Sequence, residues 1–159
     1  MSKNKVLGIV GSPKRGANTD TLVEQVLKGA EEAGAVTEKL SIAEMDIKSC
    51  TACNACQNTG KCVIEDDFAS TLEKMMESNV WVLGTPVYWW GPTAQMKAFI
   101  DRWYGVDRSV FRGKGIVRNQ AARFWIESNA SSLPFFRRSP WLSIHARRLV
   151  ITYRDDAAR

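Results

Sequence analysis

Apolar residues gather in short runs that are typical of buried strands. Residues 5–10 and 79–84 are rich in valine and lack helical spacing, and each run ends at or next to a glycine. Runs of this kind indicate strands that are buried on both faces of a parallel sheet. Residues 35–42 predict a further, shorter strand.

Between these runs, apolar positions recur every three or four residues, which predicts helices. The first helix begins at Asn18, a favourable N-cap, and ends at Gly34. The second follows Asp66 or Asp67, and the third covers residues 93–104. Alternating strands and helices predict an α/β fold with a parallel sheet between two layers of helices.

The pattern changes after Gly113. Residues 115–120 are polar where a fourth central strand should be apolar, and beyond them only residues 148–153 resemble a strand. The long segment 46–61 is also too irregular to predict an element. The strands after Gly113 therefore stay open; if they are missing, apolar flanks of the sheet would be exposed, which favours a homo-oligomer.

Charge divides the chain at the same place. Residues 1–112 carry a net charge of −1, whereas residues 113–159 carry +6, mostly from arginine. We expect a domain over residues 1–112 and a divergent basic segment over residues 113–159. The segment is either an arm that binds polyanions such as nucleic acid, with aromatic side chains for base stacking, or a foreign reading frame. The loops and the cysteine pattern in residues 1–112 can be explained without nucleic acid, so we do not expect nucleic acid as a partner.

Length and composition suit a compact core. The chain has 159 residues, of which 45% are hydrophobic and 25% charged. It contains no run of roughly 18 apolar residues, the length that crosses a membrane, and its first residues do not predict a secretion leader. We expect a cytoplasmic protein without a membrane partner.

A loop bounded by glycines, residues 11–19, joins the first strand to the first helix. At such a junction, backbone N–H groups and the helix dipole favour phosphate. The loop lacks the spacing of dinucleotide and P-loop motifs, so a mononucleotide phosphate fits best. The alternative is an ordinary capped turn. The candidate donors are Ser12, Asn18 and Thr19, with Lys14 or Arg15 as the cation.

A second loop, residues 85–92, follows the strand over residues 79–84. It places three adjacent aromatic residues between Pro86 and Pro92, at the sheet edge where doubly wound folds bind ligands. Such a rim suits contact with a flat ring. Alternatively, Trp89 and Trp90 belong to the core or to an interface, and we expect this for at least one of them.

All four cysteines lie within thirteen residues, in the pattern Cys50-x2-Cys53-x2-Cys56-x5-Cys62. The gaps are too short for two comfortable disulfides, so metal or redox chemistry is favoured. Four sulfur ligands suit a cubane iron-sulfur cluster or a tetrahedral zinc ion.

The two loops, with residues 96–102 behind them, resemble the flavodoxin-like NAD(P)H-dependent FMN reductases over about residues 5–104. The resemblance implies a flavodoxin-like doubly wound parallel sheet. It also implies that FMN binds through its phosphate to Ser12, Lys14 or Arg15, Asn18 and Thr19. The isoalloxazine ring would lie against Pro86, Val87, Tyr88 and Trp89.

The cysteine pattern is similar to that of the iron-sulfur flavoproteins, a subgroup of the same fold. This resemblance implies that Cys50, Cys53, Cys56 and Cys62 ligate a 4Fe-4S cluster that passes electrons to FMN. Zinc, or cysteines that remain without a cluster, are the alternatives.

The resemblance implies an electron-transfer flavoenzyme. A ferredoxin-like donor or NAD(P)H would supply electrons, and oxygen, peroxide or a quinone would accept them. We expect no catalytic acid or base, because the cofactors carry the chemistry. Without the cluster, the same site predicts an NAD(P)H-dependent FMN or quinone reductase. We assign structural roles to Glu65, Asp66 and Asp67 as helix caps, to Asp101 and Arg102 as pairing groups, and to His145 as a surface residue.

Overall fold

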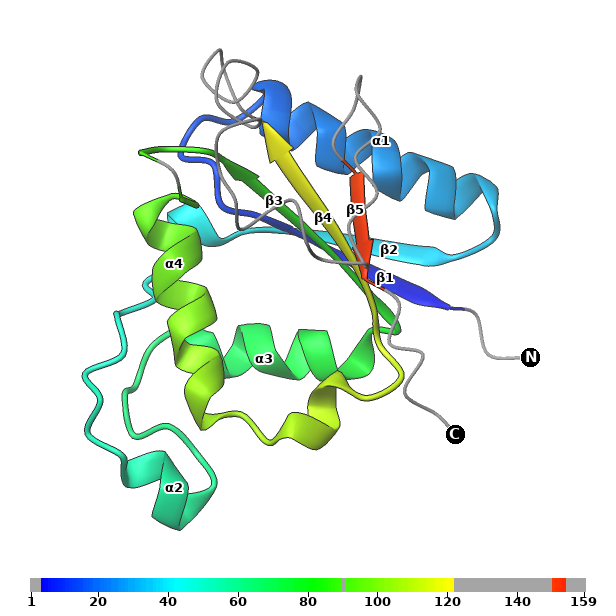
Figure 1. Cartoon of the computed structure of the whole chain (residues 1–159). Coiled ribbons are helices and arrows are strands. Elements are labelled where there is room, and N and C mark those ends of the chain that lie inside the picture. Colours follow the sequence, from blue (N-terminus) through cyan, green and yellow to red (C-terminus); the bar gives the residue numbers. More distant parts are fainter. Residues whose placement is uncertain (1–3, 90, 122–149, 154–159) are drawn as a thin grey trace, which may run out of the picture.

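The molecule is built around a mixed sheet of five strands (Figure 1). The computed structural model describes residues 4–89, 91–121 and 150–153. The strand order is β2-β1-β3-β4-β5, which is the flavodoxin order. The first four strands are parallel, and β5 is antiparallel to β4. The strands are β1 (Lys5–Val10), β2 (Val36–Ser41), β3 (Val80–Pro86), β4 (Gly115–Ala121) and β5 (Val150–Tyr153).

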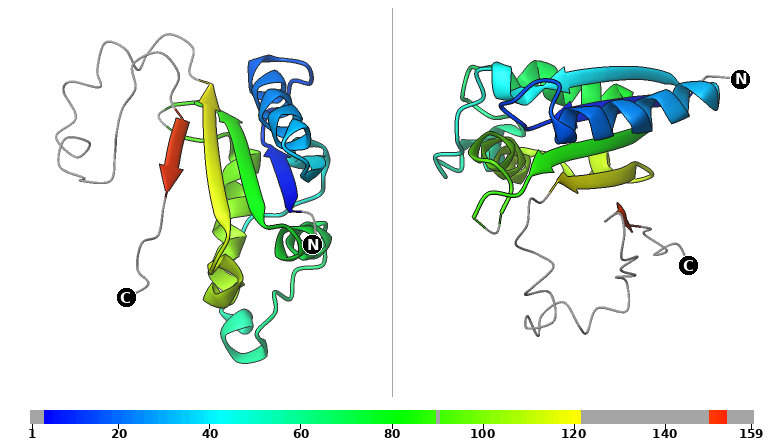
Figure 2. Two further views of the ribbon diagram at one scale, coloured as in Figure 1. Left: turned by 90° about the vertical axis from the view of Figure 1, so that its right-hand side faces the viewer. Right: turned by 90° about the horizontal axis from the view of Figure 1, so that it is seen from above.

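Helices cover both faces of this sheet. Helix α1 lies along one face, and α3 and α4 lie on the other (Figures 1 and 2). The expected three-layer, flavodoxin-like α/β fold is therefore confirmed. The α-helices are α1 (Asn18–Glu32), α2 (Ala55–Thr59), α3 (Phe68–Glu77) and α4 (Ala94–Asp101); three short 3₁₀ segments are η1 (Ile42–Glu44), η2 (Arg102–Gly105) and η3 (Arg108–Phe111).

The core has two parts because successive side chains of a strand point to opposite faces. In β1, Val6 and Val10 belong to the cluster on the α1 face. Leu7 and Ile9 belong to the larger cluster under α3 and α4. The continuous apolar runs therefore form strands that are buried on both faces, as predicted.

The sequence leaves open whether a fourth strand follows Gly113, and the structure contains one. Strand β4 pairs with β3 in parallel from Gly115, opposite Val80, to Ala121, opposite Pro86. Ile116 packs against the core cluster under α3 and α4, and Val117 packs against the cluster on the α1 face. These two apolar contacts, one on each face of the sheet, hold β4 in place, although the residues that follow Val117 in the strand are polar.

Residues 150–153 form the strand that the sequence predicted there, but its direction differs. Strand β5 runs antiparallel to β4, with Ile116 opposite Tyr153, whereas the resemblance implied a parallel sheet. The division of the chain between residues 112 and 113 stays a prediction, although the sheet continues across it.

Three details of the helices differ from the expectations. The cap before α1 is Ala17 rather than Asn18, and no side chain caps this end. The segment expected to be irregular contains the short helix α2. Helix α4 ends at Asp101 and continues as the 3₁₀ turn η2.

Several expectations concern parts of the chain that the structure does not describe. These are the arginine-rich stretch 128–147, which includes His145, and Trp90. Within the described parts, no helix combines the length and apolar character needed to cross a bilayer.

Gly84 in β3 faces α1 so closely that a methyl group there would overlap the side chain of Val23. Gly84→Ala is therefore expected to lower the free energy of unfolding by about 1–3 kcal/mol through overpacking. Gly29→Ala is the control, because a methyl group at this position in α1 meets nothing within 4 Å. It should stabilise the protein by about 0.5–1 kcal/mol. Urea unfolding measures both changes, and a Gly84→Ala variant as stable as the wild type would contradict the packing.

Candidate functional site

The two predicted binding loops meet at one edge of the sheet. They follow β1 and β3, which are parallel neighbours, and the Gly11 N–H donates a 2.8 Å hydrogen bond to the Gly84 carbonyl. Thr93, only 1% exposed, connects the loops. Its hydroxyl donates to the Gly11 carbonyl at 2.6 Å, and its N–H donates to the Thr85 hydroxyl at 3.1 Å. The structure thus brings the two loops together, at the start of α4.

In the first loop, the candidate phosphate donors differ in accessibility. Ser12 and Thr19 are buried, whereas Lys14, Arg15 and Asn18 are exposed. Ser12 exchanges 3.2 Å hydrogen bonds between its hydroxyl and the Lys14 backbone. Arg15 forms an ion pair with Glu44. Lys14 pairs with no acid among the residues described, so Lys14 is the cation that is available to an anion.

The start of α1 offers free backbone donors. The N–H of Gly16 donates to Asp20 Oδ2 at 2.8 Å. The N–H groups of Ala17, Asn18 and Thr19 find no acceptor within the described part of the chain. Free N–H groups at the start of a 15-residue helix are the ordinary basis of anion binding.

Asp20 supports this turn from within. Its carboxylate accepts from the Lys39 ammonium at 2.8 Å and from the Gly16 N–H. The Lys39 ammonium, followed by the Gly16 N–H, lowers the pKa of Asp20 below its usual value of 3.8. The sequence analysis missed this residue because its main partner lies 19 residues away on β2.

The second loop presents its aromatic side chains to solvent. Pro86 and Val87 are half-buried, Tyr88 is 52% exposed and Trp89 is 95% exposed. Reciprocal hydrogen bonds between the backbones of Tyr88 and Gly91 close the turn, and Trp89 has a φ of 45°, in the left-handed region. Trp89 is therefore no part of the core of this chain.

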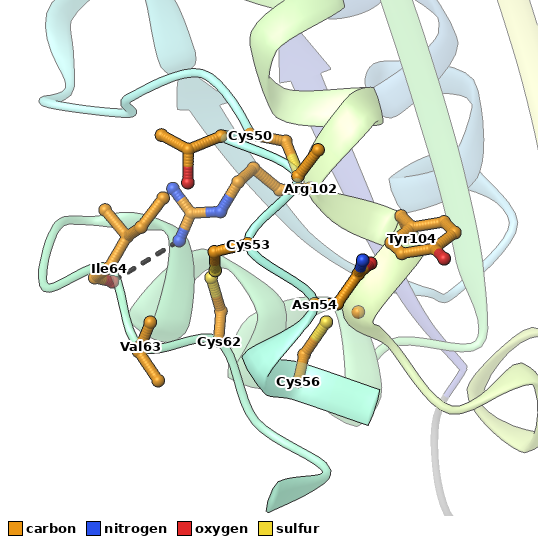
Figure 3. A pocket seen from close by; sticks show the side chains of 12 residues that line it. Cys50, Cys53, Asn54, Cys56, Cys62, Val63, Ile64, Arg102 and Tyr104 are labelled. Atoms are coloured by element: carbon orange, nitrogen blue, oxygen red, sulfur yellow. Dashed lines mark hydrogen bonds between the residues drawn. The ribbon is translucent and has the colours of Figure 1, made fainter. Parts of the chain in front are cut away.

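All four cysteines line one pocket (Figure 3). They are free thiols; Cys50 and Cys53 are exposed, and Cys56 and Cys62 are half-buried. The segment with α2, to which Cys56 belongs, lies beyond the end of α4 and away from the sheet (Figure 1). A methyl group at Gly105 would come within 3.0 Å of the Cys56 sulfur, so a glycine leaves room here for the thiol. The other lining residues include Val63, Ile64, Arg102 and Tyr104.

In the described ranges, no three Cys, His, Asp or Glu side chains are arranged to hold a single metal ion. The Ala55 N–H, followed by the Thr51 hydroxyl, lowers the pKa of the exposed Cys53 thiol. This favours the thiolate, which is the form that binds metal.

A buried ion pair lies at the base of the pocket. Arg102 Nη1 is 2.6 Å from Asp66 Oδ2, and the two side chains are 1% and 0% exposed. Burial raises the pKa of Asp66, but the Arg102 guanidinium and the N–H groups of Lys48 and Phe68 outweigh it, so the net pKa is lowered. The pKa of Arg102 is raised, because Asp66 and then Cys62 outweigh burial.

Of the acidic and basic residues near this pocket, Arg102 and Asp101 pair and Asp66 bonds the start of α3 as expected, whereas Asp67, at the N-cap position of α3, forms no capping side-chain bond. Arg102 pairs with Asp66, and Asp101 pairs with Lys97. Asp66 also accepts a 3.0 Å hydrogen bond from the Phe68 N–H at the start of α3.

Comparisons with known proteins agree with this arrangement. Residues 4–120 match the family model described as NADPH-dependent FMN reductase. An iron-sulfur flavoprotein of Methanocaldococcus jannaschii is 44% identical over 98 residues, which cover 62% of this chain and 51% of the relative. An iron-sulfur flavoprotein of Methanosarcina thermophila is 37% identical over 113 residues, which cover 71% and 59%.

Among solved structures, an NAD(P)H:quinone oxidoreductase from Methanothermobacter marburgensis aligns with a TM-score of 0.67 at 18% identity. The alignment covers 82% of this chain and 70% of that one, and it shows a shared fold.

The chain belongs to the NADPH-dependent FMN reductase family, which the match to three quarters of its residues establishes. Within that family it is similar to iron-sulfur flavoproteins, as the sequence resemblance implied. The chain spans little more than half of the length of these two relatives.

The Asp20–Lys39 pair makes stability depend on pH. Folding lowers the pKa of Asp20 below 3.8, so the unfolded chain binds the proton more tightly. The stabilisation is complete above about pH 5 and is lost as the pH falls through 3.8 toward the folded-state pKa. Asp20→Asn should therefore lower the free energy of unfolding by roughly 0.5–1 kcal/mol at pH 7, and this difference should vanish in acid.

Urea unfolding over a pH series measures this difference. Asp46→Asn is the control, because the Asp46 side chain is 69% exposed and its ammonium partner is 3.6 Å away. An Asp20→Asn deficit that is as large at pH 3 as at pH 7 would show that the charge of Asp20 contributes nothing.

Proposed function

We propose that this protein is an FMN-dependent oxidoreductase of the iron-sulfur flavoprotein type. The observation that carries the proposal is that residues at the two ends of α4 belong to the two candidate sites. The N-cap of this helix is Thr93, which joins the two loops, and its last turn leads into Arg102, which lines the cysteine pocket. The helix has 8 residues and is therefore about 12 Å long.

The residues of the first site fit FMN. The free N–H groups at the start of α1, with Ser12, Asn18 and Thr19, would bind the phosphate. Lys14 would supply the cation, since Arg15 is paired with Glu44. A bound phosphate would also accept hydrogen bonds from the backbone N–H groups at the start of α1 that have no acceptor among the described residues.

The second loop would bind the ring of the flavin. Pro86 and Val87 would support the ring from the half-buried side of the loop, and Tyr88 and Trp89 would cover it. An indole that is 95% exposed costs hydrophobic free energy in water. Contact with a flat aromatic ligand would remove that cost.

The cysteine pocket would hold the 4Fe-4S cluster. The four irons of a cubane bind four thiolates, and the pocket is lined by four free thiols. The printed names of the two archaeal relatives support the same assignment.

Bound FMN exchanges one or two electrons, and an iron-sulfur cluster exchanges one at a time. The protein would hold the flavin phosphate at the start of α1, shield its ring with the second loop, and fix four thiolates at the end of α4. We propose NAD(P)H or a ferredoxin-like protein as the donor and a small molecule as the acceptor. Free thiols accord with a reducing compartment such as the cytoplasm.

A cluster-free NAD(P)H-dependent FMN or quinone reductase is the second candidate. It is favoured by the description of the matching family, which names NADPH. The two flavin loops also lie apart from the cysteine segment and would function without it.

Loss of phosphate donors tests the flavin site. Asn18→Ala combined with Thr19→Ala should weaken FMN binding roughly a hundredfold or more, because each hydrogen bond to a charged group contributes about 1.5–3 kcal/mol. Fluorescence quenching of FMN, titrated into apoprotein, measures the affinity. Thr21→Ala is the control, since Thr21 is exposed on the same helix. Equal affinity of the double variant and the control would exclude this loop as the phosphate site.

Replacing one thiol tests the metal site. Cys53→Ser should abolish most of the broad visible absorbance of an iron-sulfur cluster and reduce the iron content, because the cubane loses a ligand. FMN content should change little, since the loops of the flavin site are separate. Ser49→Ala, in the same exposed segment, is the control. Equal iron in the Cys53→Ser variant and the control, or zinc in anaerobically purified wild type, would refute the cluster.

A further inference from the structure

Arg102 connects the two ends of the cysteine segment. Its Nη1 donates a 3.0 Å hydrogen bond to the carbonyl of Lys48, two residues before Cys50. Its Nη2 donates a 3.4 Å bond to the carbonyl of Ile64, two residues after Cys62 (Figure 3). One side chain therefore closes the base of the loop that carries all four thiols.

Asp66 holds the guanidinium in this position. Its two carboxylate oxygens lie 2.6 Å from Nη1 and 3.2 Å from Nη2 of Arg102, which is a two-point contact. The same carboxylate accepts from the Lys48 N–H at 2.9 Å. The Phe68 ring packs 4.5 Å from the guanidinium carbon, so the planar group is fixed on its face as well.

One donor of this guanidinium is unused. Arg102 is 2% exposed, and its buried Nε has no hydrogen-bond partner among the residues that the structure describes. A buried charged N–H without an acceptor is unfavourable, so native proteins rarely leave one unpaired without a reason. Arg102 lines the pocket together with Cys50, Cys53, Cys56 and Cys62, and Asp66 is not among the lining residues. The cationic end of the ion pair is thus the end that faces the thiols.

We propose that Arg102 is a positioning residue of the cysteine pocket: it holds the loop closed and supplies an N–H donor and a fixed positive charge to sulfur ligands there. The part that concerns charge rests on the proposed cluster. A reduced cluster is more negative than an oxidised one, so a nearby cation and a hydrogen bond to sulfur favour reduction. Arg102 would therefore raise the reduction potential of the cluster, while its contacts to Lys48 and Ile64 maintain the spacing of the thiols.

The test uses the full chain with two variants and a control. Arg102→Gln removes the cation and leaves Asp66 buried without its partner. Arg102→Gln combined with Asp66→Asn removes both charges, so it avoids an unpaired buried carboxylate and keeps the protein folded if the single variant is too unstable. Arg108→Gln is the control, because Arg108 is exposed on η3.

Hydrogen exchange of the metal-free protein measures loop closure without any cluster. The hydrogen-bonded amides of the cysteine segment, such as those of Gln57, Gly60 and Lys61, should exchange at least tenfold faster in Arg102→Gln than in the wild type and in Arg108→Gln, while amides of β1 keep their protection. Where the single variant does not fold, the double variant takes its place, and a faster exchange of the same amides is expected. Unchanged exchange in a folded variant would overturn the positioning role.

The reduction potential of the loaded protein measures the effect of the charge. Anaerobic redox titration, followed by the visible absorbance of the cluster, should give a lower potential in Arg102→Gln than in the wild type and in Arg108→Gln. The double variant should show a smaller fall in the same direction, because the loss of the Asp66 charge offsets part of the effect. The expected change in Arg102→Gln is at least tenfold in the ratio of reduced to oxidised cluster at a fixed potential, or about 59 mV for one electron. An unchanged potential would overturn the tuning role. Wild-type protein that takes up no iron would instead refute the proposed cluster and this tuning role with it, and the exchange measurement would still decide loop closure.

Discussion

The ion pair between Arg102 and Asp66 is the constraint on which the arrangement of the pocket depends. Both side chains are almost completely removed from water. Burial of two charges is compensated only where geometry and further hydrogen bonds are good. Here the carboxylate receives two bonds from the guanidinium and two from the backbone N–H groups of Lys48 and Phe68. Removal of one partner of such a pair typically costs about 3–5 kcal/mol, so the pair fixes α3, α4 and the cysteine segment relative to one another.

Helix α4 connects this ion pair to the two loops of the candidate flavin site. Met96 and Phe99 are 1% and 0% exposed and belong to the core cluster of the sheet, so the helix is anchored along its length. Its first turn is capped by the Thr93 hydroxyl, which accepts from the Met96 N–H at 3.2 Å and donates to the Gly11 carbonyl. The two candidate sites are therefore attached to the ends of one packed helix, and a change in its position would affect both.

Much of the fold could be predicted from the sequence because its signals are local. The apolar runs of β1 and β3 and the periodic positions of α1 and α3 determine where these elements lie. The order of strands then places both loops at one edge of the sheet. Strand β4 was hard to predict because the polar residues from Arg118 onward outnumber its two partly buried apolar side chains, Ile116 and Val117, one for each face.

The contacts that organise the sites are not local, and the sequence carries no signal for them. Arg102 and Asp66 are 36 residues apart, and Thr93 is 82 residues from Gly11. The sequence analysis identified Arg102 as a pairing residue but not its partner. The preference between Lys14 and Arg15 also depended on a distant residue, Glu44 on η1, which pairs with Arg15.

The central claim is that one chain holds both FMN and an iron-sulfur cluster. The most direct measurement is the visible absorption spectrum of anaerobically purified protein, combined with FMN, iron and acid-labile sulfide analysis. The account predicts flavin bands on a broad iron-sulfur absorbance, with about one FMN, four irons and four sulfides per chain. FMN without iron and sulfide would contradict the cluster, and protein that binds neither FMN nor iron would contradict the account as a whole.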